Sequence, residues 1–137
     1  MGNNEAVVEQ FRAAIESGDL GEFARVMRAH SSDDYVQEWP QSGERIRGRE
    51  ASIKLDEGYS AATGMTPTLK LRRITGGGDV YVVEATIDYG DGTPVSFVSI
   101  AEFRDGKLFK ATEYFANPFP APEWRAGFVE RMDPVGV

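Results

Sequence analysis

The sequence contains no cysteine, which excludes disulfide bonds, thiolate nucleophiles and cysteine-based zinc or iron–sulfur sites. It contains only one histidine, His30, so a metal site built from histidines is not expected either. We therefore expect no metal and no organic cofactor. The function has to come from carboxylates, hydroxyls, amides and aromatic rings.

Basic residues are also fewer than acidic ones. The sequence has 15 Lys and Arg and 22 Asp and Glu, which gives a net charge of −7. Such a charge argues against nucleic acid or an anionic membrane as a partner. No apolar run approaches the roughly 20 residues that span a bilayer, and residues 1–6 lack the charged and then apolar build of a secretory signal. We expect a cytoplasmic protein.

What the sequence does contain is enough apolar material for one core. It has 137 residues, of which 41% are hydrophobic, and a chain of this length buries roughly two-thirds of its unfolded surface. No internal repeat, low-complexity tract or linker divides it. We predict a single domain over residues 1–137.

Apolar spacing and glycine turns divide this domain into helices followed by strands. A period near 3.6 predicts the helices and β-branched or aromatic runs predict the strands. The order of helices first and strands afterwards is typical of an α+β fold, in which a curved antiparallel sheet wraps around helices on one face. The predicted helices are 5–17, 20–29, 50–62 and a C-terminal one at 122–132, and the predicted strands are 34–40, 68–75, 80–89, 95–104 and 107–115.

The last hairpin carries the most informative pattern, because side chains of a strand alternate between faces. A three-residue loop at 104–106 pairs Phe103 with Lys107 and gathers the odd-numbered residues on one face. A two-residue turn separates the faces less cleanly, so we favour the longer loop. The odd-numbered face is then Phe97, Ser99, Ala101, Phe103, Phe109, Ala111, Glu113 and Phe115.

Glu113 is the candidate catalytic residue. It lies opposite Phe97 in this register and one diagonal step from Ser99, on an otherwise apolar face. Burial disfavours its charged form, which raises its pKa toward the range useful in general acid–base catalysis. The alternative, that Glu113 lies at the rim and is bonded to a tyrosine or an arginine, stays open.

Other side chains are expected to line an apolar central pocket with Glu113. For the aromatic residues core packing is the alternative, and for Glu38 it is a solvent-facing position on a short strand. These residues are Phe11, Glu38, Trp39, Tyr59, Tyr81, Phe97, Ser99 and Phe115.

The opposite, even-numbered face is too apolar for a purely wet surface, with Val98, Ile100, Leu108 and Tyr114 among its members. We expect it to form the contact of a homodimer. Cover by the proline-rich tail of the same chain is the alternative, and the two do not exclude each other.

Several short motifs stand out along the chain, namely IESGDL at 15–20, the Pro40 turn leading to GREA at 48–51, FRDGK at 103–107 and EYF at 113–115. Together they resemble the nuclear transport factor 2-like superfamily, with SnoaL-type cyclases as the nearest branch. The resemblance implies a cone-shaped α+β roll with a deep apolar pocket, commonly dimeric through the sheet.

The resemblance also indicates where the catalytic residues of known family members would lie in this chain. The ketosteroid isomerase Tyr falls on Phe11, its base Asp falls near Trp39, and its protonated Asp falls on Ser99. Steroid isomerisation by that mechanism is therefore not expected. The catalytic Asp of SnoaL-type cyclases falls on Glu113, whereas its partner His falls on Ser99. Limonene-type epoxide hydrolases also place an Asp at Glu113, but the strand at 80–89 lacks their Arg.

Two functions therefore stay open. One is an acid–base enzyme, such as a cyclase, isomerase, dehydratase or hydrolase, in which Glu113 moves a proton on a small apolar molecule. The other is a non-catalytic ligand-binding or accessory dimeric module that uses the same pocket.

Overall fold

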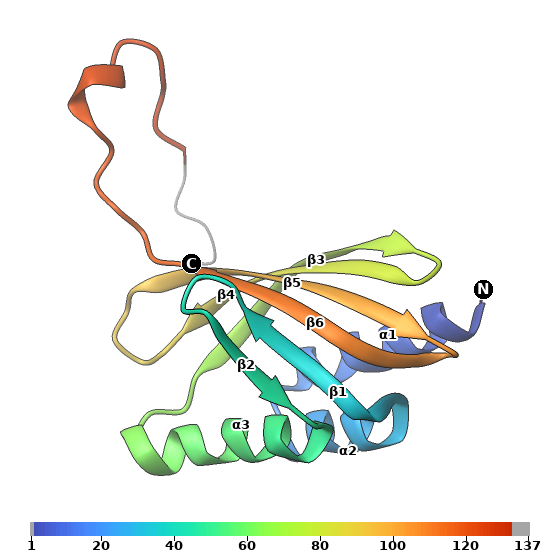
Figure 1. Cartoon of the computed structure of the whole chain (residues 1–137). Helices are drawn as coiled ribbons and strands as arrows, with labels where there is room; N and C mark the ends of the chain where they lie inside the picture. The colour runs from blue at the N-terminus through green and yellow to red at the C-terminus, as the bar shows by residue number, and fades with distance from the viewer. Residues whose placement is uncertain (1, 133–137) are drawn as a thin grey trace.

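In the computed structural model, which describes residues 2–132, the chain folds as three α-helices on one face of a six-stranded sheet (Figure 1). This confirms the α+β class and the cone-like roll. The elements are α1 (Gly2–Ser17), α2 (Leu20–His30), β1 (Ser31–Trp39), β2 (Glu44–Arg47), α3 (Arg49–Thr63), β3 (Thr68–Gly77), β4 (Val80–Asp88), β5 (Pro94–Arg104), β6 (Lys107–Ala116) and a 3-10 turn, η1 (Glu123–Arg125).

Local chemistry explains where the helices begin and end. Asp19 caps α2, because its Oδ1 accepts from the backbone N–H of Gly21 at 2.8 Å. Gly64 ends α3 with φ of 74°, and its N–H donates to the Ser60 carbonyl at 2.9 Å. A left-handed residue of this kind closes a helix without a Cβ clash, so the chain turns toward β3.

The sheet has the order β2-β1-β6-β5-β4-β3. Its neighbours pair antiparallel except for β1 and β6, which are parallel. The expectation of a wholly antiparallel sheet is therefore wrong at one pair. Parallel neighbours need a long connection, and here it runs from β1 through β2, α3 and three further strands before β6 returns beside it.

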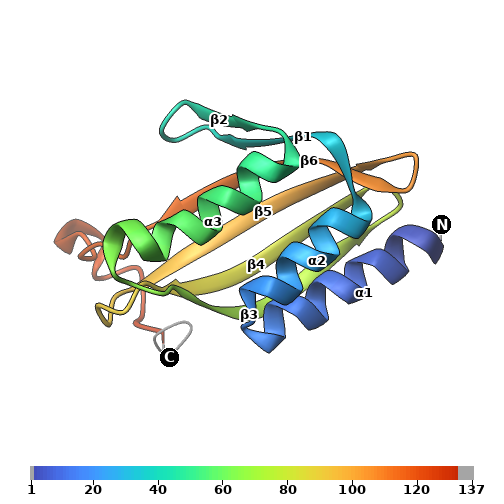
Figure 2. The ribbon, with the colours of Figure 1, turned by 90° about the horizontal axis from the view of Figure 1, so that it is seen from below.

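The helices cover the concave face of the sheet and leave the other face open (Figure 2). The main core packs under them and includes Val8, Met27, Ile53, Phe103 and Leu108. A second, smaller cluster joins Ala85, Ile87, Val95 and Phe97. Tyr89 and Phe115 pack against that second cluster, which places aromatic rings beside the strand that carries Glu113.

The hairpin between β5 and β6 differs from the expected one. Asp105 and Gly106, with φ of 54° and 76°, form a two-residue turn, so Phe103 pairs with Leu108 and not with Lys107. A bulge follows, because Glu102 pairs with Lys110 and leaves Phe109 as the extra residue.

Because of this bulge, Leu108 and Phe109 point to the faces opposite to those predicted for them. Leu108 is 6% exposed in the core, whereas the Phe109 ring lies 4.5 Å beneath the Arg104 guanidinium on the outer face. Beyond the bulge the odd-numbered residues are on the concave face again. The expectation that Phe109 points inward and Leu108 outward is therefore wrong, while the inward orientation of Glu113 holds in the structure.

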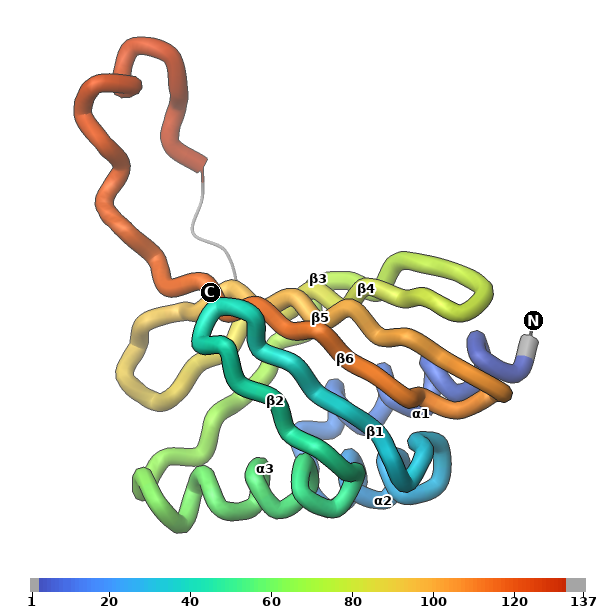
Figure 3. The backbone as a smooth tube through the Cα atoms, viewed as in Figure 1, coloured from blue at the N-terminus to red at the C-terminus, as the bar shows by residue number. Residues whose placement is uncertain are grey.

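The C-terminal segment is not the helix predicted at 122–132. Only Glu123–Arg125 turn as a 3-10 helix. Helices of this length are marginal without a surface to pack on, and Gly127 weakens this one further. The segment leaves the end of β6 and extends away from the sheet and the helices (Figure 3).

Candidate functional site

The Glu113 carboxylate is held between two neighbouring strands. Its Oε2 accepts a hydrogen bond from Ser99 Oγ on β5 at 3.0 Å. Its Oε1 accepts from Gln37 Nε2 at 2.8 Å and from Trp39 Nε1 at 3.1 Å, both on β1. Three donors from opposite sides therefore fix the position of a half-buried carboxylate on the concave face.

Sheet register explains this arrangement. Ser99 lies directly opposite Glu113 in the β5–β6 pair, and not one diagonal step away as expected. On the other side, Gln37 pairs with Ala111 in the parallel β1–β6 ladder. Alternation along β1 then directs both Gln37 and Trp39 to the concave face, where their donors reach Glu113.

A second layer orients the amide of Gln37. Its Oε1 accepts from Tyr35 Oη at 3.2 Å and from Ser52 Oγ at 2.7 Å. Since both donors occupy the amide oxygen, the amide nitrogen is directed to Glu113. Tyr35 and Ser52 are 3% and 5% exposed, so a buried polar chain connects α3 through β1 to the carboxylate.

Burial raises the pKa of Glu113 above its usual value, while the hydrogen bonds from Trp39, Ser99 and Gln37 act in the opposite direction without cancelling the effect. The Asp56 carboxyl on α3 is coupled to it. Burial, together with the charges of Glu113 and Glu57, raises the pKa of Asp56 from 3.8 to about 6. Two acids with raised pKa values therefore come from the sheet and from the helix that covers it.

Aromatic rings surround this polar centre. Phe115 contacts Trp39 and Phe97 with ring centroids 5.9 Å and 5.0 Å apart, and Tyr59 lies 5.7 Å from Tyr89. The Glu113 charge contributes to a raised pKa of Tyr89, after burial and Tyr59. Among the expected pocket residues, the structure thus brings Trp39 and Ser99 into contact with Glu113, and Phe97 and Phe115 beside them.

Other expected pocket residues lie elsewhere. Phe11 of α1 packs edge-on against Phe23 of α2 at 5.8 Å, and Tyr81 of β4 packs edge-on against Phe103 of β5 at the same separation. Tyr81 belongs to the main core, and Phe11 is partly buried against it.

Glu38 is on the outer face of the sheet, so its expected place in the pocket is wrong. Its Oε2 accepts from Arg45 Nε at 2.7 Å, and its Oε1 lies 3.2 Å from Lys110 Nζ. The reason is alternation, because Glu38 stands between two inward residues of β1.

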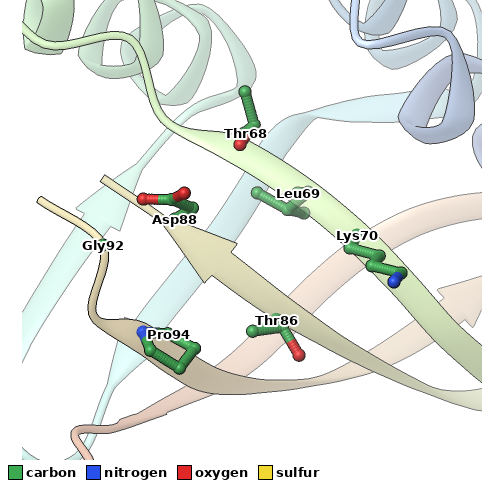
Figure 4. Close-up of a pocket in the computed structure, with 7 residues that line it drawn as sticks. All are labelled: Thr68, Leu69, Lys70, Thr86, Asp88, Gly92 and Pro94. Atoms are coloured by element: carbon green, nitrogen blue, oxygen red, sulfur yellow. The ribbon is translucent and has the colours of Figure 1, made fainter. Parts of the chain in front are cut away.

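Two hollows among residues 2–132 are lined by side chains other than Glu113. The first, of about 260 Å³, lies between β3, β4 and the start of β5 (Figure 4). It is lined by Thr68, Leu69, Lys70, Thr86, Asp88, Gly92 and Pro94. The second, of about 320 Å³, is on the outer face and is lined by Asp34, Val36, Glu38, Arg45, Arg47, Arg104, Phe109 and Lys110. The apolar central pocket therefore stays a prediction.

Over residues 2–132, no group of three or more His, Asp or Glu side chains is placed to hold a metal ion. In the same part of the chain, no helix has the length and apolar character needed to cross a membrane.

Sequence reasoning missed three polar members of the site: Gln37, Ser52 and Asp56. Gln37 lies between Tyr35 and Trp39 at a spacing of two, so the alternation of β1 contained the signal. Ser52 and Asp56 lie one turn apart and flank Ile53 on the inner side of α3. The helical period that selected Ile53 and Tyr59 therefore also indicated Asp56.

Comparison with known proteins identifies the family of this chain. The sequence model of the SnoaL-like domain matches residues 8–111. An NTF-2 like protein of unknown function from Burkholderia xenovorans LB400 is 34% identical, with a TM-score of 0.74 over 96% of this chain and 97% of that one. No curated protein matches the chain.

More distant structures share the fold. A ketosteroid isomerase-like protein from Kribbella flavida DSM 17836 is 22% identical, with a TM-score of 0.77 over 98% of this chain and 93% of that one. A protein assigned as a SnoaL-like polyketide cyclase, from Jannaschia sp. CCS1, is 17% identical, with a TM-score of 0.67 over 83% and 85%. The chain belongs to the SnoaL-like domain family, within the nuclear transport factor 2-like fold.

Proposed function

We propose that this protein binds a small, largely apolar organic molecule against the concave face of the sheet, and that Glu113 moves a proton to or from it. The observation that carries the proposal is the Glu113 carboxylate itself. It is half-buried beside aromatic rings, has a raised pKa and is fixed by three donors.

The arrangement suits a general base. A carboxylate whose pKa lies above its usual value is a stronger base than an ordinary one, and in its ionised form it can accept a proton from a bound molecule. Hydrogen bonds from Ser99 and Trp39 hold its oxygens in place, so little reorganisation is needed when the proton arrives. Asp56, with a pKa raised to about 6, supplies a second carboxyl group that exchanges protons.

The proposed step is proton abstraction from an acidic C–H bond of the bound molecule. The proton passes to a Glu113 oxygen, and the electron pair stays on the substrate as an enolate or drives the closing or breaking of a bond. Glu113 then returns the proton. Polyketide cyclases and ketosteroid isomerase-like proteins among the structural neighbours support this class of substrate. The resemblance places the Tyr of steroid isomerisation at Phe11 and its two Asp near Trp39 and at Ser99, so that mechanism is not proposed.

A non-catalytic binding module is the second candidate, and one observation favours it. The three donors to Glu113 all come from the protein itself. In that case the carboxylate organises β1, β5 and β6, and a ligand is held by the surrounding rings.

A probe reaction separates the two candidates. The compound 5-nitrobenzisoxazole is small and apolar, and it opens to a coloured cyanophenolate when a base removes its C–H proton and the N–O bond breaks. We expect the protein to accelerate this opening, with a rate that rises as Glu113 ionises. Glu113→Gln should lower kcat/KM by about 100-fold or more.

Glu38→Gln is the matched control, because it removes the same charge on the outer face. It should leave the rate unchanged. Saturable binding of the probe without a Glu113-dependent rate would instead support the binding module, and equal rates for Glu113→Gln and the unmodified protein would rule out the proposed base.

A further inference from the structure

The hollow of about 320 Å³ on the outer face carries an excess of positive charge. It lies over β2, β1 and β6, which are neighbours at one side of the sheet (Figure 1). We call it the basic hollow. Its charged lining consists of four cations, Arg45, Arg47, Arg104 and Lys110, and two acids, Asp34 and Glu38. An excess of two positive charges on a chain whose net charge is −7 marks this place as one that attracts anions.

Sheet register sets two of these cations on either side of an apolar residue. Val36 of β1 pairs with Arg47 of β2 and with Lys110 of β6. Side chains directly opposite one another on neighbouring strands share a face, so Arg47 and Lys110 flank Val36 on the outer face. Val36 is only partly buried. The floor between the two positive charges is therefore apolar.

Arg47 is the cation that has no counter-ion in the fold. Within residues 2–132 its exposed side chain makes no hydrogen bond or ion pair. Arg45 and Lys110, in contrast, share one acid, because Arg45 Nε donates to Glu38 Oε2 at 2.7 Å and Lys110 Nζ lies 3.2 Å from Glu38 Oε1. One carboxylate thus offsets two cations, and the positive charge at Arg47 is not offset at all.

An aromatic ring supports the fourth cation. The Arg104 guanidinium lies 4.5 Å from the centroid of the Phe109 ring, and the β-bulge at Phe109 is the feature that brings this ring to the outer face. A guanidinium stacked on a ring keeps the N–H groups at its edge for an acceptor.

The acid next to Arg104 is a weak competitor for those N–H groups. Arg104 Nη2 lies 3.4 Å from Asp34 Oδ2, and the two side chains are 55% and 75% exposed. Exposed ion pairs of this kind contribute little free energy. An anion with two negative charges therefore has an advantage over Asp34 at this guanidinium.

We propose that the basic hollow binds a small phosphate monoester, with the phosphate group between Arg47, Lys110 and Arg104 and the organic part against Val36 and Phe109. A phosphate monoester carries about −1.5 to −2 charges at neutral pH, which matches the excess of two positive charges. Arginine forks bind phosphate oxygens in pairs. The volume of about 320 Å³ lies in the range of small-molecule sites, about 300–1,000 Å³, and leaves space for the organic part.

Phenyl phosphate is the probe, because it joins this dianion to one apolar ring. Isothermal titration calorimetry at low ionic strength should give a Kd of about 1 mM or tighter. Benzenesulfonate has a similar shape with a single charge, and inorganic phosphate has the charges without the ring. Each should bind about 5-fold or more weakly than phenyl phosphate. No binding of phenyl phosphate, or equal binding of either other compound, would overturn the proposal.

A pair of arginine variants tests the role of Arg47. Arg47→Gln should weaken the binding of phenyl phosphate by about 10-fold, since it removes a charged donor to the phosphate. Arg72→Gln is the matched control. Arg72 is also an exposed strand arginine without a partner within residues 2–132, but it lies on β3, at the other end of the strand order. Its replacement should change the Kd by less than about 2-fold. Equal losses in the two variants would show attraction by the overall charge alone and overturn the site, and circular dichroism checks that both variants are folded.

Nuclear magnetic resonance locates the bound probe. Phenyl phosphate should shift the backbone amide signals of residues 34–38, 45–47 and 104–110. Shifts centred on Ser99 and Glu113 would place the compound on the concave face and overturn the proposal. The basic hollow is on the opposite face from Glu113, so failure of this site and failure of the proposed activity are distinguishable.

Discussion

Ser99 is the donor to Glu113 that sequence reasoning identified and the structure places in contact with it. It is 7% exposed and donates to Oε2, whereas Gln37 and Trp39 share Oε1. Each hydrogen bond to the charged form stabilises it, and burial opposes it. The pKa of Glu113 is therefore set by a balance that a single hydroxyl changes.

Removing this hydroxyl should move the pKa of Glu113 in a known direction. Ser99→Ala takes away one donor to the carboxylate, so we expect the pKa of Glu113, already raised by burial, to rise further. Carbon-13 NMR of labelled glutamate measures it. Ser96→Ala, three positions earlier on the outer side of β5, is the matched control and should leave the titration where it is. A fall in the Glu113 pKa would contradict the assigned hydrogen bond.

At the scale of elements, the turn between β3 and β4 depends on one glycine. Gly76 has φ of 147°, and a Cβ built on it would lie 2.3 Å from the Val80 carbonyl oxygen and 2.7 Å from the Tyr81 Cα. Both obstacles are backbone atoms, which do not move aside as a flexible side chain does. The close approach holds β3 against β4 near Tyr81, which is part of the core.

Gly76→Ala should therefore lower the free energy of unfolding by about 2–4 kcal/mol, through backbone strain and displaced strands. Gly77→Ala is the control next to it. A Cβ there meets nothing within 4 Å, so its effect should stay within about 1 kcal/mol. Urea denaturation of the two variants measures the difference. Equal losses would show that the contact at Gly76 does not constrain the turn.

The elements also show how far a sequence pattern reaches. Apolar spacing located three helices and the strands of the C-terminal half, because burial of one face is a local property of each segment. It did not predict the parallel pairing of β1 with β6, since pairing depends on contacts between distant segments. The predicted helix at 122–132 failed for a related reason, because its apolar stripe has no surface of its own chain to cover.

The candidate site, like the fold, was predicted only in part from the sequence. Alternation along β6 predicted that Glu113 faces the concave side, and the bulge at Phe109 preserved that result despite a different turn. Gln37 became a partner of Glu113 only through the parallel ladder, and Asp56 only through the packing of α3 on the sheet. The sequence contained their periodicity, but the contacts required the assembled fold.

For the whole molecule, charge and burial act together on stability. With a net charge of −7, the acidic groups of the folded chain repel one another at neutral pH. In addition, burial raises the pKa values of Asp56 and Glu113. A group whose pKa is higher in the folded state binds a proton that the unfolded chain has already lost. The free energy of unfolding therefore falls as pH rises through that window.

Asp56 gives this pH dependence its testable form. Its pKa rises from 3.8 to about 6 on folding, so its destabilising effect is absent below about pH 4 and complete above about pH 6.5. Asp56→Asn removes the charge and keeps the shape. It should raise the free energy of unfolding by about 1–3 kcal/mol at pH near 7.5, and the gain should vanish toward pH 4.

Urea denaturation across this pH range measures the gain, and Glu57→Gln is the control. Glu57 is the exposed neighbour of Asp56 on α3, so the same loss of charge there should change stability by no more than about 0.5 kcal/mol. If the gain in the free energy of unfolding for Asp56→Asn were the same at every pH, the gain would come from packing and not from ionisation. A loss at pH near 7.5 would mean that the ionised carboxylate stabilises the fold, and that α3 does not bring Asp56 into a dry space beside Glu113.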